Sequence, residues 1–234
     1  MSYFFQEQPM PGTLYLVATP IGNLEDISFR ALRILKEVDL VVYEERKAGS
    51  ALLRHFGIEK PVESLNEHNE AAATSVILAA LKKGSNVAVV SDAGTPVFSD
   101  PGQMLVRKAI DAGIKIVPIP GATSLMPALI SSGFPIEQFV FAGFLSPKRN
   151  RRIVELQQLK KESRTIVLMD TPYRLVALLR DIADVLGPAR RLSVAFDLTM
   201  PTEEIFRGTA QSLLQLFSKD ERKGVFVIVV EGSK

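Results

Sequence analysis

The sequence predicts an α/β protein with two α/β domains, the first built on a mostly parallel sheet and the second on a mixed sheet. Through the first half, short apolar runs alternate with stretches of helical periodicity, as in repeated βαβ units. Several of these runs end in loops that contain Gly, Pro and polar side chains. Towards the C-terminus, strand-like segments follow one another around one helical stretch, which favours a mixed or antiparallel sheet.

The first domain is predicted from strand and helix patterns that alternate in order. Strands are expected over residues 13–18, 40–43, 61–65, 87–90 and 115–119, where apolar side chains dominate. Helices are expected over 24–37, 50–56, 72–83 and 103–112, several of them followed by Gly. Because helices connect successive strands, the strands are expected to run mostly parallel.

The second domain begins with a predicted helix over 125–132 and a strand over 139–144. A basic stretch, 148–152, precedes a predicted helix over 153–161, and a buried strand over 165–169 is followed by a helix that Pro172 starts and that ends at Leu186. Strands over 191–198, 203–209 and 225–231 enclose a helix over 210–217. We place the domains at 1–120 and 121–234, and a short junction of this kind implies a cleft between two packed domains.

Composition and charge exclude several classes of protein. The 234 residues carry a formal net charge of +2, so a polyanion would have to be bound by a local patch. Without cysteine there are no disulfides or thiolate metal sites, and with two histidines we expect no metal. The N-terminus lacks the pattern of a signal peptide and no apolar run reaches membrane-spanning length. We therefore expect a soluble, cytoplasmic protein with no membrane association.

The loop after the strand over 87–90 is the strongest sign of a ligand site. It reads S-D-A-G-T-P-V-F-S-D-P-G, where Gly94 allows close approach of a ligand to the backbone and Pro96 fixes the turn. Similar loops, T-P-I-G-N and P-G-A-T-S, follow the strands over 13–18 and 115–119. In open α/β sheets ligands bind outside the carboxyl ends of strands, so these loops predict a site for a polar ligand that is held largely by main chain.

Familiar catalytic motifs are missing from these loops. The first turn has no G-x-G-x-x-G, and the chain contains neither a G-x-x-x-x-G-K-[ST] phosphate loop nor a G-x-S-x-G nucleophile elbow. Dinucleotide binding of the Rossmann type, nucleoside triphosphate hydrolysis and serine hydrolase chemistry are therefore not predicted.

A combination of sequence blocks resembles one family. The blocks are L-V-A-T-P-I-G-N-L-E-D-I at 16–27, H-N-E at 68–70, V-S-D-A-G-T-P at 90–96, S-D-P-G at 99–102 and P-G-A-T-S at 120–124. Together they resemble the ribosomal RNA small subunit methyltransferase I family of the tetrapyrrole methylase superfamily, from about Gly12 to the C-terminus. The resemblance implies S-adenosylmethionine bound in a cleft between two α/β domains, a homodimer, and 2′-O-methylation of a cytidine in 16S rRNA of the 30S subunit.

The resemblance also implies which residues bind the cofactor. The positions that match the family's cofactor loops, or a strand end near the cofactor, are Pro20, Asp92, Ala93, Gly94, Thr95, Pro96, Gly121, Thr123, Ser124, Met169 and Asp170. A sulfonium cation favours nearby carboxylates and carbonyl dipoles, and its amino acid part needs hydrogen-bonding partners. Such loops provide carboxylates and carbonyl dipoles for the cation and hydrogen-bonding groups for the amino acid part.

Two further sets of residues are candidates for the reaction and for the substrate. Removal of the hydroxyl proton needs a base, and the candidates are Glu25, Asp26, Glu44, His68 and Glu70, each with capping or a surface ion pair as the alternative role. RNA phosphates would be contacted by Lys148, Arg149, Arg151 and Arg152, with Arg46 and Lys47 as further candidates. A solvated helix start is the alternative for 148–152.

The chain departs from the family pattern mainly at charged positions. It reads E-E-R-K at 44–47 where the family usually has E-D-T-R, D-T-P-Y-R-L at 170–175 where it has E-S-P-H-R-L, and F-D-L-T-M at 196–200 where it commonly has R-E-L-T-K. Typical members also carry a small C-terminal extension. Two alternatives therefore stand beside the rRNA methyltransferase: a small-molecule methyltransferase of the tetrapyrrole branch, and a cofactor-binding homologue without catalysis.

Overall fold

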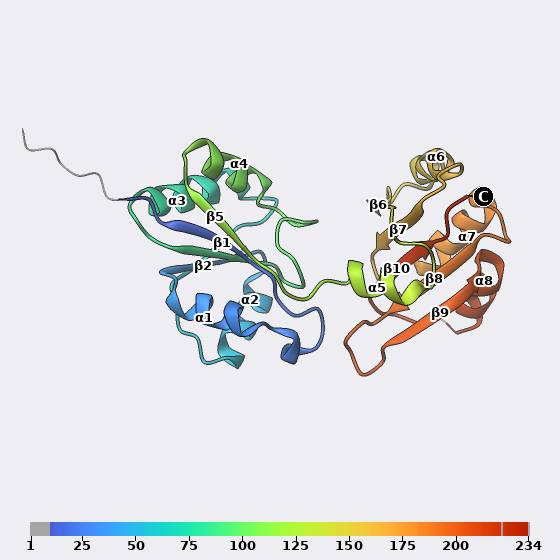
Figure 1. The fold of residues 1–234 in the computed structure, drawn as a ribbon, viewed down its shortest axis with the longest axis horizontal. Helices are drawn as coiled ribbons and strands as arrows, with labels where there is room; N and C mark the ends of the chain where they lie inside the picture. Colours follow the sequence, from blue (N-terminus) through green and yellow to red (C-terminus); the bar gives the residue numbers. More distant parts are fainter. Residues whose placement is uncertain (1–9, 221, 234) are drawn as a thin grey trace, which may run out of the picture. The chain divides into compact units, whose positions relative to one another are not determined.

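A computed structural model of the protein describes residues 10–220 and 222–233 (Figure 1). The chain divides into two compact units, the first ending at Thr123 and the second beginning at Ser124. The boundary expected from the sequence lay at residue 120. Each unit has its own sheet and its own hydrophobic core.

The first unit contains a parallel sheet, as predicted. Its strands are β1 (Thr13–Val17), β2 (Leu40–Tyr43), β3 (Val62–Ser64), β4 (Val87–Val90) and β5 (Lys115–Ile119). They lie in the order β3-β2-β4-β1-β5, and every recorded pair is parallel. The central strand β4 is buried along its whole length, which explains its uninterrupted apolar sequence.

Helices cover both faces of this first sheet (Figure 1). The helices α1 (Phe29–Glu37) and α2 (Arg46–His55) pack on the face that carries Val17, Val41 and Val90. The helices α3 (Glu70–Lys82) and α4 (Gln103–Asp111) pack on the opposite face. Alternate strand residues supply the two cores, as expected for a sheet buried on both sides.

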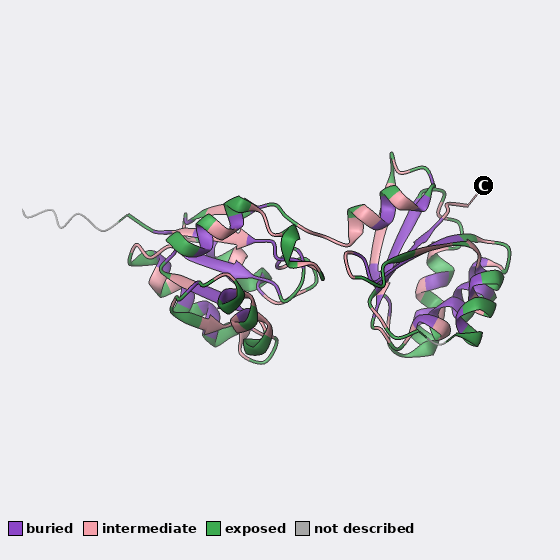
Figure 2. Ribbon diagram, turned by 90° about the horizontal axis from the view of Figure 1, so that it is seen from below, coloured by how far each residue is buried: buried purple, intermediate pink, exposed green. Residues whose placement is uncertain are grey.

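The second unit contains a mixed sheet, also as predicted. Its strands are β6 (Phe139–Phe144), β7 (Thr165–Asp170), β8 (Arg191–Phe196), β9 (Glu204–Thr209) and β10 (Phe226–Val230), in the order β6-β7-β10-β8-β9. Only β6 and β7 are recorded as a parallel pair among these strands, and the other recorded pairs are antiparallel. The helices α6 (Arg149–Leu159), α7 (Leu175–Leu186) and α8 (Ala210–Lys219) share one core with the sheet, and α5 (Leu125–Ser132) contacts β8, β9 and β10. Figure 2 shows strands buried beneath partly exposed helices.

Five helices begin elsewhere than the sequence pattern indicates. Helix α2 begins at Arg46 rather than at residue 50, and α3 begins at Glu70 rather than at residue 72. The stretch expected as one helix over 24–37 is a short 3-10 turn, Leu24–Asp26, followed by α1, because the Ser28 side chain accepts a hydrogen bond from the Ala31 amide and caps a new helix. Helix α6 already begins at Arg149, so the basic stretch lies within its first turn. Helix α7 begins at Leu175 rather than at Pro172.

No helix in the described part of the chain is long and apolar enough to cross a membrane.

Candidate cofactor site and basic surface

Backbone hydrogen bonds hold together the loops that follow β1, β4 and β5. The amide of Thr19 donates to the carbonyl of Gly94 at 2.9 Å, and the amide of Gly94 donates back to Thr19 at 3.1 Å. The Thr19 hydroxyl also donates to the carbonyl of Ser91 at 2.9 Å. On the other side, the amide of Ala18 donates to Ile119 at 3.1 Å. The loops are thus fixed neighbours at the carboxyl edge of the first sheet.

This edge is the topological switch point of the first sheet. Strands β1 and β4 are neighbours, but the chain leaves β1 for helix α1 on one face and leaves β4 for helix α4 on the other. Ligands of open α/β sheets bind at such an edge, outside the carboxyl ends of the strands. The sequence-predicted residues Pro20, 92–96 and Gly121 all lie on these loops.

Two glycines on these loops are required by close packing or by backbone conformation. Gly94 has φ +87°, and a Cβ placed on it would lie 3.2 Å from Cγ2 of Ile21 and 3.7 Å from the carbonyl oxygen of Ala122. A Cβ on Gly121 would lie 3.1 Å from Cβ of Ala18. A side chain at either position would press against a neighbouring loop, so the close packing of the loops accounts for both glycines. Their part in a ligand site stays a prediction.

Carboxylates surround the carboxyl ends of β2 and β4. Burial raises the pKa of Glu44 above its usual value, and the negative charges of Asp100 and Asp92 raise it further. Burial also raises the pKa of Asp92, although the amide of Glu45 donates a hydrogen bond to this carboxylate at 3.1 Å and lowers it. Like charges gathered at a partly buried site favour a cationic ligand, which relieves their repulsion.

The structure separates the candidates for proton removal. Glu44 lies among the carboxylates just described, whereas Glu25 and Asp26 are exposed on the 3-10 turn. His68 is also exposed, and its Nε2 lies 3.4 Å from the carboxylate of Glu67.

Glu70 caps a helix, which is the alternative role that the sequence left open for it. Its Oε1 accepts hydrogen bonds from the amides of Gly102 at 2.9 Å and Met104 at 3.3 Å, and so caps the start of α4. This contact ties helix α3 to the end of the loop that follows β4.

Met169 and Asp170 end strand β7 in the second unit. The Asp170 side chain is only 1% exposed, with Oδ2 3.2 Å from the guanidinium of Arg174, while Oδ1 accepts the Thr171 amide at 2.7 Å. Burial raises the pKa of Asp170, and the Thr171 hydrogen bond and the charge of Arg174 oppose that shift. Of the remaining cofactor candidates, Thr123 ends the first unit and Ser124, the N-cap residue of α5, begins the second.

The basic stretch is divided between exposed and buried side chains. Lys148, Arg149 and Arg151 are exposed. Arg149 nevertheless pairs with Asp181 at 2.9 Å while remaining 59% exposed. Arg152 is only 5% exposed, and its guanidinium lies 2.7 Å from the buried Asp181 carboxylate. The expected contact of Arg152 with a phosphate is therefore corrected: its charge is neutralised inside the protein, where the pair joins α6 to α7.

Asp181 was missed by the sequence analysis. The sequence indicates that Asp181 is buried, because its carboxylate lies between Leu178, Ile182 and Val185 on the apolar face of α7. An unpaired charge would be costly there. Such a residue predicts a buried cationic partner, but only the fold identifies that partner.

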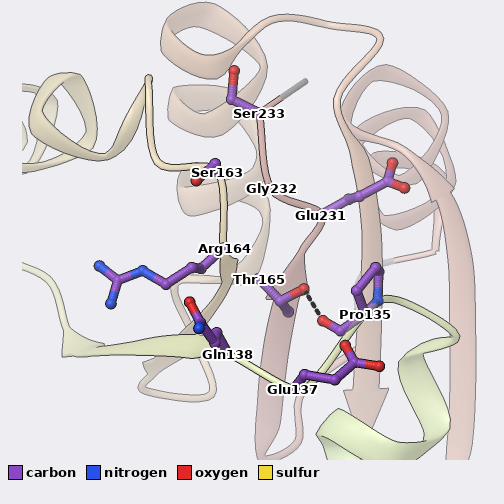
Figure 3. Close-up of a pocket in the computed structure, with 9 residues that line it drawn as sticks. All are labelled: Pro135, Glu137, Gln138, Ser163, Arg164, Thr165, Glu231, Gly232 and Ser233. Atoms are coloured by element: carbon purple, nitrogen blue, oxygen red, sulfur yellow. Dashed lines mark hydrogen bonds between the residues drawn. The ribbon is translucent and has the colours of Figure 1, made fainter.

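A cavity of about 430 Å³ lies at the end of the second sheet that is opposite to Met169 and Asp170 (Figure 3). It is lined at the amino ends of β6 and β7 and the carboxyl end of β10 by Pro135, Glu137, Gln138, Ser163, Arg164, Thr165, Glu231, Gly232 and Ser233. The Arg164 guanidinium is engaged by Glu162 at 2.8 Å. Since ligands of α/β sheets bind at carboxyl ends, we assign no role in catalysis to this cavity. Within the described residues, no cluster of His, Asp and Glu is placed to hold a metal ion.

The fold, together with the loops at the carboxyl edge of the first sheet, is that of a methylase of the tetrapyrrole class. A family model described as "Tetrapyrrole (Corrin/Porphyrin) Methylases" matches residues 13–214. Solved structures agree on the fold: uroporphyrin-III-C-methyltransferase from Thermus thermophilus superposes with a TM-score of 0.66 at 22% identity, and a cobalt precorrin-4 methyltransferase with 0.69 at 18%, each over 94% of both chains.

Relatives in sequence indicate the family within this class to which the chain belongs. Proteins called "Ribosomal RNA small subunit methyltransferase I" are 48% identical in Synechocystis sp. over 95% of this chain and 80% of theirs, and 43% identical in Escherichia coli O157:H7 over 95% and 79%. The Thermotoga maritima protein of that name is 43% identical over 95% of this chain and 100% of its own. The chain belongs to the ribosomal RNA small subunit methyltransferase I family, and it is a methyltransferase, as the sequence blocks predicted.

Proposed function

We propose that this protein transfers a methyl group from S-adenosylmethionine to the 2′-hydroxyl of a cytidine in 16S rRNA. The observation that carries the cofactor assignment is the set of hydrogen-bonded loops at the carboxyl edge of the first sheet, which bring together Gly94, Gly121 and the carboxylates around Asp92. The relatives called ribosomal RNA methyltransferases support the choice of substrate.

The residues of these loops suit this cofactor in hydrogen bonding and in charge. The glycine at position 94 lets a ligand approach the backbone closely, and the adjacent amides and carbonyls can offer hydrogen bonds. Glu44 and Asp92, whose pKa values are raised by burial, favour a ligand that carries positive charge. When bound, S-adenosylmethionine supplies an electrophilic methyl group on a sulfonium.

The protein's own part in the reaction is alignment and proton removal. The fixed loops hold the reacting groups in line, which is the main requirement of methyl transfer to a hydroxyl. Glu44 is the candidate we favour for accepting the hydroxyl proton, because its raised pKa is closer to neutrality than that of an ordinary carboxylate. The part of Met169 and Asp170 in cofactor binding stays a prediction, as does that of Thr123 and Ser124.

Substrate binding is proposed at the basic surface formed by Lys148, Arg149 and Arg151. Exposed cations there can contact phosphates, so the affinity for RNA is expected to fall as salt rises. Arg46 and Lys47, exposed at the start of α2 in the first unit, are further candidates. A 30S substrate places the reaction in the cytoplasm, and the resemblance to the family favours a homodimer, which sedimentation of the purified protein would test.

The decisive experiment uses purified protein, tritiated-methyl S-adenosylmethionine and 30S subunits from cells that lack this methyltransferase. Label in 16S rRNA that maps to a cytidine 2′-oxygen is the expected result. Subunits from cells that contain the enzyme are the matched control and should accept little label. Cofactor binding by calorimetry without label in any rRNA would contradict the proposed substrate and favour a tetrapyrrole-type substrate or a homologue without catalysis.

A further inference from the structure

Two exposed aromatic side chains lie at the carboxyl ends of neighbouring strands in the second unit. Tyr173, which follows β7, is 81% exposed, and Phe144, the last residue of β6, is 54% exposed. Because β6 and β7 run parallel, with Phe144 paired in register with Met169, both aromatic residues belong to the same edge of the sheet. Phe is among the residues most often buried, and Tyr is intermediate, so two such rings exposed at one edge offer a sizeable apolar contact area.

The backbone that carries Tyr173 is held in place on both sides. The amide of Arg174 donates to the carbonyl of Thr171 at 3.0 Å and closes a turn around Tyr173. The guanidinium of Arg174 donates to the carbonyl of Ser146 at 3.0 Å and lies 3.2 Å from the Asp170 carboxylate. The loops after β6 and β7 are therefore tied together, and the exposed ring stands on a fixed support rather than on a free loop.

Exposed cations stand just beyond the loop that follows β6, at the start of α6. Lys148 and Arg151 follow β6 closely in the chain, and in the described part of the protein neither side chain is recorded with a carboxylate partner. The buried pair of Arg152 with Asp181 anchors the helix turn that carries them. This edge therefore combines positive charge without internal partners and an aromatic ring without a packing partner.

We infer that Tyr173 stacks on an unpaired base of single-stranded RNA whose phosphates are contacted by Lys148 and Arg151. Aromatic rings and cations together are how proteins bind unpaired nucleotides, since the ring stacks on any base while the cations follow the backbone. This inference rests on the proposed function and adds that the substrate is read in an unpaired segment. Phe144 provides a second apolar surface at the same edge.

The test compares two substitutions of similar size in the full-length protein. Tyr173→Leu keeps apolar area and removes the aromatic face, whereas Tyr173→Phe keeps the face and removes the hydroxyl. For Tyr173→Leu we expect the affinity for protein-free 16S rRNA to fall roughly 5- to 150-fold, the range for loss of one stacked base. The KM for 30S subunits should rise accordingly, with kcat and the affinity for S-adenosylmethionine unchanged. Tyr173→Phe should bind and react as the wild type does.

Three outcomes would overturn the inference. Equal affinity of Tyr173→Leu and wild type for RNA would exclude stacking. A loss shared by Tyr173→Phe would assign the effect to the hydroxyl. An effect seen with 30S subunits but not with protein-free rRNA would make the contact one with a ribosomal protein. Failure of the wild type itself to bind or methylate rRNA would instead contradict the proposed function, so the two failures are distinguishable.

Discussion

Gly94→Ala adds a single methyl group to the centre of the proposed cofactor site. The new Cβ would lie 3.2 Å from Ile21 and 3.7 Å from the carbonyl of Ala122, so it would occupy the space between the loops that follow β1 and β5. Because Gly94 has φ +87°, the substitution also strains the backbone. The experiment must separate these two effects.

Gly113→Ala is the matched control for the strain. Gly113 also has a positive φ, +68°, but a Cβ placed there meets nothing within 4 Å. The left-handed conformation costs about 1–2 kcal/mol for a residue with a side chain, so both variants should lose about that much free energy of unfolding. For a unit of this size the midpoint of thermal unfolding should fall by several degrees in each.

Only Gly94→Ala should weaken cofactor binding. If the cofactor packs against Gly94, the added methyl group competes with it for space. A cost of about 1–3 kcal/mol for such overpacking corresponds to a dissociation constant roughly 5- to 150-fold higher for S-adenosylmethionine. Calorimetric titration of both folded variants, at a temperature well below unfolding, measures this constant. If Gly94→Ala binds the cofactor as tightly as Gly113→Ala, the cofactor does not bind against this loop and our placement of the site is refuted.

Three further substitutions and one control substitution test the carboxylates and the buried ion pair. Arg152→Met should lower the free energy of unfolding by about 3–5 kcal/mol, because it removes the buried partner of Asp181 and leaves only the exposed Arg149. Arg33→Met at an exposed pair should cost less than about 1 kcal/mol in the same urea titrations. Because the folded pKa of Glu44 is raised above 4.5, its ionisation destabilises the fold as pH rises through that pKa. Glu44→Gln should therefore unfold at a higher temperature than wild type at pH 8, with the difference vanishing below about pH 4; no difference at pH 8 would argue against the repulsion. Glu70→Ala should cost about 1–2 kcal/mol of stability through loss of the α4 cap, and a kcat reduced by orders of magnitude in the folded variant would instead identify Glu70 as the base.

The elements that could be predicted from the sequence are those with local signals. Strands β2 and β4 were predicted to the residue, because a strand buried on both faces has a continuous apolar sequence bounded by turn residues. Boundaries failed where side chains compete for the backbone. Ser28 caps α1 and divides a stretch whose periodicity alone indicates one helix.

The amino-acid sequence by itself determined the order of strands and helices, and with it the edge at which Gly94 and Gly121 would be placed. It could do so because periodicity and glycine loops are properties of neighbouring residues. The tertiary structure decided which side chains are available for function. It buried Arg152 on Asp181, 29 residues away, used Glu70 to cap a helix 32 residues away, and left Tyr173 exposed on a fixed turn. These roles depend on contacts between distant segments, and no local pattern of charge distinguishes a buried arginine from an exposed one.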